Sequence, residues 1–332
     1  MTAVYVSPHT DFKFHPQITQ VGCYWHTGFH VEIYVVEGDQ LAVVDTGVTD
    51  SPTRYLAPAL AALGHRIEDV DLIINTHGHM DHSGGNNGLV RLSGAEVCVH
   101  EDDVEVTEDL DLQFEQYWSV GDKATSHPER LADSLAYFRM HAGGPTRVTR
   151  PLHDGERLDL GRGVELTVIH SPGHTLGSSC FLWEREGVLL TGDSVLGTER
   201  DLGGLPLIFY PDLYLRTLDR LEAVDLSCLC LAHHYGSLSL THESVKWGGA
   251  GKQFVQESRE IALLIQEAMS SAMLGGSLPF LQAARVATRS LQERLGLRLD
   301  PESGLAETHG VPALLAYWEA MTREAHTMEP AT

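Results

Sequence analysis

The chain has 332 residues, of which 42% are hydrophobic, so it can bury a substantial core and is not intrinsically disordered. Its 23 lysines and arginines stand against 46 aspartates and glutamates, and the resulting net charge of −23 disfavours a nucleic-acid backbone as a partner. The five cysteines are too few, and odd in number, for a disulfide framework. No apolar run is typical of a membrane span or a secretory signal. We therefore expect a cytoplasmic protein that binds neither membrane nor nucleic acid.

The first part of the chain alternates strand and helix patterns. Apolar residues at every second position predict a strand over 30–36, followed after a turn by a second strand over 41–44. Helical spacing of leucines predicts a helix over 51–63 that ends at Gly64. The mostly apolar run 70–75 predicts a buried strand. This alternation is typical of an α/β protein.

The same alternation continues downstream, with two exceptions. We expect strands over 96–100, 164–170, 180–183, 187–191 and 226–232, and a helix over 213–221. Residues 101–150 are acidic and helical in pattern, which indicates an insertion between core strands. The end of the chain predicts helices alone, over 254–274, 281–295 and 312–325. We therefore divide the chain into a core domain over 1–250, which includes the insertion 101–150, and a C-terminal helical region over 251–332.

Residues 77–82 read His-Gly-His-Met-Asp-His and follow a predicted buried strand. Gly78 allows a tight turn there, so side chains one or two positions apart can face a common point. Neutral imidazole binds zinc at ~2.0–2.1 Å, and a carboxylate can bind or bridge. Burying so many polar groups without a metal would cost desolvation for little gain. The run therefore predicts a metal site with His77, His79, Asp81 and His82 as ligands.

Three later positions complete a coordination set at the ends of predicted strands. His174 follows a Pro-Gly turn, and Asp193 ends the run Leu-Leu-Thr-Gly-Asp. His233 and His234 follow the last predicted strand. Metal and ligand sites of α/β sheets commonly lie at such strand ends. Alignment with the strand favours His233 as the ligand, which leaves His234 to hydrogen-bond to a substrate or to relay a proton.

In this order, the motifs resemble those of the metallo-β-lactamase superfamily over about residues 17–245. The matching features are Asp45 in an Asp-Thr-Gly turn, the run 77–82, His174 in Ser-Pro-Gly-His-Thr, Asp193 in Thr-Gly-Asp, and a terminal histidine. The resemblance implies an αββα sandwich, with 1–250 as its catalytic domain and two metal ions between the sheet edges. The chain departs from the family at its last motif, because Ala-His-His stands where Gly-His-Gly is usual.

The resemblance also implies how the ligands are shared between the ions. The first ion would be held by His77, His79 and His174. The second ion would be held by Asp81, His82 and the terminal histidine, with Asp193 bridging. Asp45 would orient a ligand imidazole from behind. Nitrogen and oxygen donors suit Zn²⁺, Mn²⁺ or Fe, and zinc is the first expectation because imidazoles outnumber carboxylates.

A pair of divalent ions ~3.5–4 Å apart lowers the pKa of a shared water toward neutrality. We therefore expect a metal-bridging hydroxide to attack an acyl carbonyl, with Asp81 protonating the leaving group. The glyoxalase II and lactonase-like branch of the family implies a thioester, ester or lactone of a small molecule as substrate. A phosphodiesterase or ribonuclease, a β-lactam hydrolase, and a metal-bound scaffold without turnover remain as alternatives.

Substrate specificity is expected outside the shared core. Four aromatic residues of the insertion can either cap an acyl pocket or pack its helices onto the core: Tyr117, Trp118, Tyr137 and Phe138. The C-terminal helices are placed like the helical addition of glyoxalase II, but no basic residues are clearly marked for a glutathione carboxylate. Their apolar residues can instead form a homodimer face, with Leu278, Leu281, Leu291, Leu295 and Trp318 as candidates.

Overall fold

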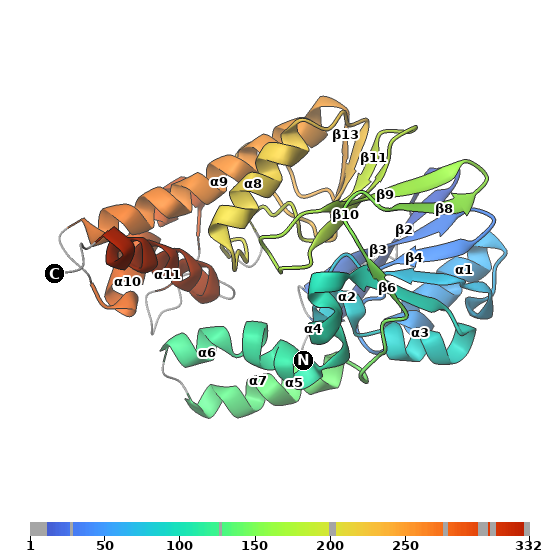
Figure 1. Cartoon of the computed structure of the whole chain (residues 1–332), viewed down its shortest axis with the longest axis horizontal. Helices are drawn as coiled ribbons and strands as arrows, with labels where there is room; N and C mark the ends of the chain where they lie inside the picture. The colour runs from blue at the N-terminus through green and yellow to red at the C-terminus, as the bar shows by residue number, and fades with distance from the viewer. Residues whose placement is uncertain are drawn as a thin grey trace, which may run out of the picture.

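Two β-sheets face each other at the centre of the molecule, with helices on both outer faces (Figure 1). The computed structural model describes residues 12–26, 29–125, 128–198, 204–274, 278–297, 305 and 310–328. The two sheets between outer layers of helices confirm the predicted αββα sandwich. In the described part of the chain, none of the helices combines the length and apolar composition needed to cross a bilayer.

The first sheet has its strands in chain order: β1 (Phe12–His15), β2 (Ile18–His26), β3 (Phe29–Glu37), β4 (Leu41–Val44), β5 (Leu72–Ile74), β6 (Glu96–His100) and β7 (Arg150–Leu152). Strands β1 to β4 pair antiparallel, and β4 to β7 pair parallel. The carboxyl ends of β4, β5 and β6 therefore meet at one edge of the sheet, which is the edge where β5 delivers the chain to residues 77–82.

The second sheet has the order β13 (Val245–Trp247), β12 (Cys228–Cys230), β11 (Val188–Leu190), β10 (Ser179–Trp183), β9 (Val164–His170) and β8 (Arg157–Gly161). Only β11 and β12 pair parallel. The sequence predicted β9 to β12 but not β7, β8 and β13. Strands β10 to β12 are mostly apolar runs, whereas β7, β8 and β13 each contain charged residues.

Period-2 alternation assigns each strand residue to one of two cores. In β4, Ala42 and Val44 face the second sheet, whereas Leu41 and Val43 face the helices on the outer side. Those outer helices are α1 (Ala57–Leu63) and α3 (Asn86–Ser93), and α1 is preceded by a π-helical turn, Pro52–Leu56. Strand β4 is thus buried on both faces, which explains its continuous apolar run.

The outer face of the second sheet is covered by α8 (Pro211–Glu222) and α9 (Gly249–Met273), followed by α10 (Phe280–Leu295) and α11 (Gly310–Met328). Side chains of α8 to α11 share one hydrophobic core with Leu189 and Leu229 of the sheet. The apolar residues considered for a dimer face pack against or within this core, and the Trp318 indole donates a hydrogen bond to the Leu278 carbonyl (3.1 Å).

The insertion between β6 and β7 is helical, as its sequence predicts. It contains α4 (Val104–Glu108), α5 (Leu110–Gln113), a π-helical segment Phe114–Trp118, α6 (Val120–Thr125) and α7 (Pro128–His141). These helices form a small core of their own against Met80 of the short helix α2 (Met80–Ser83). Helix α6 contacts α11, so the insertion meets the C-terminal helices beside the sandwich (Figure 1).

Candidate metal centre

The predicted ligands lie on loops at strand ends of both sheets. The loop after β5 carries His77 and His79, and α2 carries Asp81 and His82. From the second sheet, His174 follows β9 and Asp193 follows β11. Side chains more than a hundred residues apart therefore converge where the two sheets face each other.

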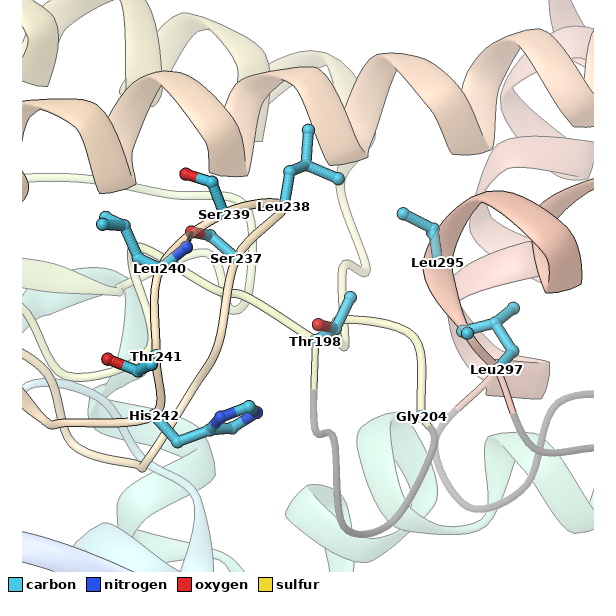
Figure 2. A pocket seen from close by; sticks show the side chains of 11 residues that line it. Thr198, Gly204, Ser237, Leu238, Ser239, Leu240, Thr241, His242, Leu295 and Leu297 are labelled. Carbon is cyan, nitrogen blue, oxygen red and sulfur yellow. Dashed lines mark hydrogen bonds between the residues drawn. The ribbon is translucent and has the colours of Figure 1, made fainter.

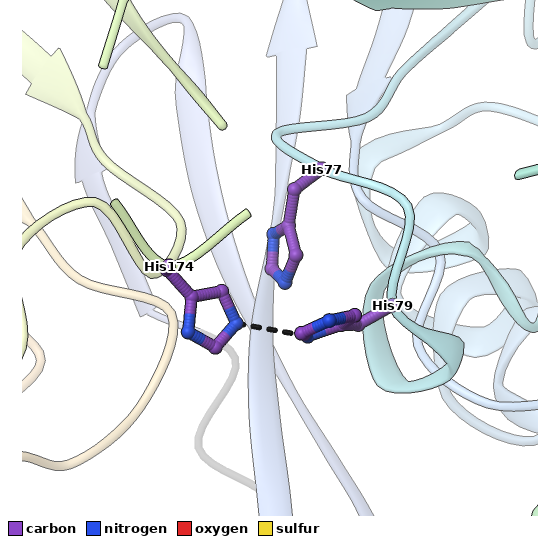
Figure 3. Close-up of side chains that lie close together, drawn as sticks. All are labelled: His77, His79 and His174. Carbon is purple, nitrogen blue, oxygen red and sulfur yellow. Dashed lines mark hydrogen bonds between the residues drawn. The ribbon is translucent and has the colours of Figure 1, made fainter. Parts of the chain in front are cut away.

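Three buried histidines form the first candidate ligand group. Figure 3 shows His77 and His79, from one loop, and His174, from another, pointing toward one another, and their ligand atoms lie within 4.8 Å of one another. His174 Nε2 lies 2.8 Å from His79 Nδ1. The ring planes of all three cross steeply, at 74° to 85°. In-plane lone pairs of such rings can meet at a common point.

Asp81, His82 and His233 form the second group. His233 Nε2 lies 3.5 Å and His82 Nε2 3.7 Å from Asp81 Oδ2. Asp193 lies between the two groups: its Oδ2 is 3.5 Å from His174 Nε2 and its Oδ1 is 3.5 Å from His233 Nε2. The carboxylate of Asp193 thus faces ligands of both groups.

The hydrogen bonds behind these imidazoles fit a metal site. The Nδ1–H groups of His82, His174 and His233 donate to Asp45 Oδ2 (2.8 Å), the Leu207 carbonyl (2.7 Å) and the His30 carbonyl (2.6 Å). This pattern leaves each Nε2 of a neutral ring with its lone pair directed inward, as in protein metal ligands. Within the described residues, the buried atoms His77 Nε2, His82 Nε2 and Asp193 Oδ1 have no hydrogen-bond partner. Each such buried atom costs about 1–3 kcal/mol unless something else engages it.

The electrostatics of the centre favour cations. Burial alone would lower the pKa of His233, but the carboxylates of Asp193 and Asp81 raise it to about 9. Burial likewise opposes ionisation of Asp193, yet the imidazoles of His233 and His82 hold its pKa well below the usual range. Burial lowers the pKa of His77 well below its ordinary value, and His82 acts in the same direction. Protons on some imidazoles therefore balance the carboxylates when no metal is bound.

Asp45 anchors the loop after β5 from behind. Its Oδ1 accepts the Thr76 backbone N–H (2.8 Å), and its Oδ2 accepts the Thr76 hydroxyl (2.8 Å) as well as the His82 imidazole. Asp45 has φ of 62°, in the left-handed region that a residue other than glycine rarely adopts. Such strain is concentrated at functional sites, and here it turns the carboxylate toward His82.

Sequence reasoning missed Asp103, which lies just after β6. Its fully buried carboxylate accepts the Gly78 N–H (2.9 Å), the Thr175 hydroxyl (2.8 Å) and the Gly177 N–H (2.7 Å). One carboxylate thus joins the loop of His77 and His79 to the loop of His174. The pattern Glu-Asp-Asp after a predicted strand was the only signal, and it is ordinary for a surface turn.

Gln113 of the insertion supports the same loop. Its side-chain amide donates to the Gly78 carbonyl (2.6 Å) and to the Val106 carbonyl (2.9 Å), and the residue is fully buried. The insertion therefore helps to shape the metal centre. A glutamine in a helix carries no sequence signal for such a role.

The two neighbouring histidines after β12 point to different partners. His233 faces Asp81 and Asp193, as described above, whereas His234 Nε2 lies 2.7 Å from Glu32 Oε1. The rings of His234 and His30 are 4.1 Å apart. The geometry thus separates two residues whose roles the sequence left open.

The predicted pocket aromatics fall into different environments. Tyr117 contacts His79 edge-on, with ring centroids 4.6 Å apart. Trp118 and Phe138 pack within the small core of the insertion. Tyr137 accepts a hydrogen bond from the Trp25 indole (2.9 Å). Of these four residues, Tyr117 is the one that touches a candidate ligand ring among the contacts described.

Phe209 forms a second aromatic wall that sequence reasoning missed. Its ring centroid lies 4.9 Å from that of Tyr117 and 6.1 Å from those of His79 and His174. It lies in the loop before α8, where no motif marks it. Together, the rings of Tyr117 and Phe209 form an apolar wall along one side of the first ligand group.

A separate cavity of about 350 Å³ lies beside the loop 237–242 and the end of α10 (Figure 2). Hydroxyls of Thr198, Ser237 and Ser239 and the side chains of Leu238 and Leu297 are among its lining. None of the candidate ligands lines it, so this cavity is distinct from the metal centre.

Comparison with known proteins gives a consistent family. The family model described as "Metallo-beta-lactamase superfamily" matches residues 26–233. The acyl-coenzyme A thioesterase MBLAC2 of Homo sapiens is 31% identical over 210 residues, which cover 61% of this chain and 71% of that protein. The atrochrysone carboxyl ACP thioesterase AgnL7 of Paecilomyces divaricatus is 32% identical over 126 residues, 36% of each chain.

Solved structures agree on the architecture. A metallo-beta-lactamase family protein from Thermus thermophilus superimposes with a TM-score of 0.67 at 24% identity, over 94% of this chain and 95% of that one. The match extends over nearly the whole length, so it includes helices outside the range of the family model. At this level of identity, the likeness concerns the fold.

Proposed function

This chain belongs to the metallo-β-lactamase superfamily, and from that premise we propose that it is a dinuclear metal-dependent hydrolase of small acyl thioesters. The expectation of a hydrolase is borne out by relatives that are named thioesterases. The observation that carries the dinuclear proposal is the position of Asp193 between two groups of three ligands each. A carboxylate in that position suits a bridge between two cations.

We assign the ligands as the geometry groups them. His77, His79 and His174 would hold one ion, and Asp81, His82 and His233 the other, with Asp193 between them. Zinc is our first choice, because imidazole nitrogens outnumber carboxylates in this donor set, and Mn²⁺ and Fe are the alternatives. When bound, such a pair of ions supplies hydroxide from a shared water at neutral pH and polarises an acyl carbonyl.

The residues of the chain itself supply orientation and proton transfer. Asp45 fixes the ring of His82, and Asp103 fixes the two loops of the first ligand group. The Asp81 side chain is 16% exposed, compared with 6% for Asp193. Asp81 therefore lies on the more open side, where its carboxylate can take the proton released by the attacking water and pass it to the departing thiolate. His234 Nε2 pairs instead with Glu32 Oε1, so we assign it no part in this proton transfer.

The acyl part of the substrate would lie against the aromatic wall of Tyr117 and Phe209. Both rings contact histidines of the first ligand group, so an apolar chain placed there would have its carbonyl beside the metal centre. Aromatic rings of this kind bury apolar ligand surface efficiently. In this proposal residues 1–250 form the catalytic domain, and the helical region 251–332 supports its second sheet.

The test combines metal analysis with a substrate panel on one purified sample. We expect about two ions per chain, and hydrolysis of thioesters ahead of lactones, β-lactams and phosphodiesters. Chelation should abolish hydrolysis, and zinc or manganese should restore it. Full activity without bound metal, or preferential cleavage of phosphodiesters, would contradict the proposal.

A variant pair sharpens this test. Asp193→Asn should lower metal content and reduce kcat/KM by more than the ~10–100-fold that is typical for residues behind a ligand. Asp133→Asn, which changes an exposed carboxylate of α7, should leave both quantities at the wild-type values. Equal metal content and equal kcat/KM in the two variants would show that Asp193 is not part of the metal centre.

A further inference from the structure

A separate group of ligand-type side chains lies where β3 meets the segment after β12. His30 and Glu32 are two positions apart on β3 and so share a face of the strand. His234 approaches them, and one ligand atom from each of the three lies within 4.8 Å of the others. We propose that His30, Glu32 and His234 bind a third divalent transition-metal ion, separate from the two of the catalytic centre.

Backbone contacts hold this group in place. The Glu32 N–H donates to the Ala232 carbonyl (2.6 Å), and the His30 carbonyl accepts the Nδ1–H of His233 (2.6 Å). These bonds fix β3 against residues 232–234, so the three side chains meet without any rearrangement of the main chain. Preorganised ligands of this kind lose little conformational entropy when an ion binds.

One pair of ligand atoms is spaced as in the main centre. His234 Nε2 lies 2.7 Å from Glu32 Oε1, much as His174 Nε2 lies 2.8 Å from His79 Nδ1. In both pairs a shared proton can stand where a cation would bind. The His234 backbone N–H also donates to His30 Nε2 at 3.3 Å, and binding of an ion through this nitrogen would replace that long hydrogen bond.

Ring orientation distinguishes this group from another cluster of histidines. The planes of His30 and His234 are inclined by 56°, so their in-plane lone pairs can converge. His100 and His170 also lie near a carboxylate, but their rings are stacked with planes only 8° apart. Lone pairs in parallel planes do not meet, so the cluster of His100 and His170 is not a comparable site.

Space and charge also suit a cation. Glu32 is only 2% exposed, and its neighbour across the strand pair is Gly22. A Cβ at Gly22 would lie 3.4 Å from Glu32 Oε2, so the glycine leaves room beside the carboxylate. His30 and His234 are partly exposed, which gives an entry path. Two imidazoles and one carboxylate suit Zn²⁺, Mn²⁺, Fe²⁺ or Co²⁺.

The test is ion stoichiometry with zinc alone, measured by equilibrium dialysis and elemental analysis. We expect Glu32→Gln to bind one ion fewer than wild type at saturation, because the only charged ligand of the group is lost. The matched control is Glu37→Gln: Glu37 lies on the same strand, 3.2 Å from His65 Nε2, but joins no three-ligand group among the described residues. It should bind as many ions as wild type.

A second variant keeps the test valid if Glu32→Gln is unstable. His30→Gln should lose the same ion, while thermal denaturation confirms that the chain is folded. Wild-type stoichiometry in both folded variants, or an equal loss in Glu37→Gln, would overturn the proposal. The readout is the difference in bound zinc ions per chain between wild type and variant, so it does not depend on the hydrolase assignment. If the proposed catalytic centre bound fewer ions than expected, the number would fall equally in every sample and the difference would stay the same.

Discussion

At the scale of single residues, a buried carboxylate does more for the centre than its place in the sequence indicates. Asp103 ties the loop of His77 to the loop of His174 through three hydrogen bonds. Burial raises the pKa of Asp103, against the effect of the Thr175 hydroxyl and the two backbone donors. Loss of the carboxylate would remove the acceptor of the Gly78 and Gly177 N–H groups, whereas the Thr175 hydroxyl also lies 2.8 Å from Ser178 Oγ.

We expect Asp103→Asn to lower the free energy of unfolding by about 2–4 kcal/mol, because an amide cannot accept all three hydrogen bonds. The same change should weaken zinc binding, since both loops carry ligands of the first group. Urea denaturation and competition with a chelator would measure the two effects. Asp102→Asn is the control, because its side chain is 51% exposed. Equal effects of the two substitutions would show that Asp103 has no special role.

Zinc uptake should release protons from the centre. The carboxylates of Asp193 and Asp81 raise the pKa of His233 to about 9, so this imidazole holds a proton below that pH when no metal is bound. A ligand imidazole must be neutral, so apparent zinc affinity should rise as pH increases from about 6 to about 9. Calorimetry at pH 8 in buffers of different ionisation enthalpy would detect the release. The release should be smaller in His233→Asn, and an unchanged value there would contradict the assignment.

The sequence singled out the candidate ligands, which the structure brings together, because they stand in short motifs next to strand ends. Asp103, Gln113 and Phe209 escaped prediction for the opposite reason. Their roles depend on contacts between distant segments, such as Asp103 with Gly177 and Phe209 with Tyr117. A side chain whose partner lies far away in the sequence leaves no local pattern.

At the scale of elements, the loop that follows His233 and His234 is tied to α9 by one residue. Glu257 accepts hydrogen bonds from the Ser237 hydroxyl, from the N–H and hydroxyl of Ser239, and from Gln253. Burial opposes ionisation, but these donors lower the pKa of Glu257 to about 2. The ionised carboxylate therefore stabilises the folded state.

The stabilisation by Glu257 depends on pH because its carboxylate must be ionised. The pKa is lowered on folding, so the stabilisation is complete above about pH 4.5 and is lost as pH falls toward 2. Glu257→Gln should cost about 1 kcal/mol at pH 7, a small value because the group is partly exposed. The difference from wild type should shrink below pH 4.5. Guanidinium denaturation at several pH values would test this, with the exposed Glu260→Gln as control. A difference that is independent of pH would contradict the pKa argument.

Elements with a clear apolar pattern were predicted well, and elements without one were not. Helices α8 to α11 and strands β9 to β12 all appear where apolar spacing placed them. Strands β11 and β12 have only three residues each, but they are continuous apolar runs. Strand β13, also of three residues, reads Val-Lys-Trp, and helix α2 reads Met-Asp-His-Ser, so neither shows an apolar pattern. The helix predicted over 51–63 begins with a π-helical turn, which side-chain spacing does not distinguish from the α form.

At the scale of the whole molecule, the net charge of −23 has consequences for substrate choice. A thioester of coenzyme A carries several phosphate charges and would be repelled, whereas a thioester with an uncharged thiol would not. We expect kcat/KM for an acyl-coenzyme A to rise between about 20 mM and about 500 mM salt, because screening weakens the repulsion. A neutral acyl thioester of the same chain length should change little. A fall in kcat/KM with salt for the charged substrate would instead indicate local basic groups at the entrance.

The placement of the C-terminal helices could not be read from the chain. Their periodicity predicts that they are helices with an apolar face, and a dimer face was one interpretation. In the structure that face shares a core with β11 and β12, and α11 also meets the insertion. Periodicity shows that a face is buried, but not which surface buries it.

The division of ligands between the sheets bears on when the centre can form during synthesis. A nascent chain that has emerged only through β7 already holds His77, His79, Asp81 and His82, but both groups stay open until the second sheet supplies His174 and His233. Ions can therefore be bound by both complete ligand groups only after the segment that carries His233 has been synthesised. A tightly held ion would mark a chain that has already formed both sheets, rather than serve as the nucleus from which folding starts.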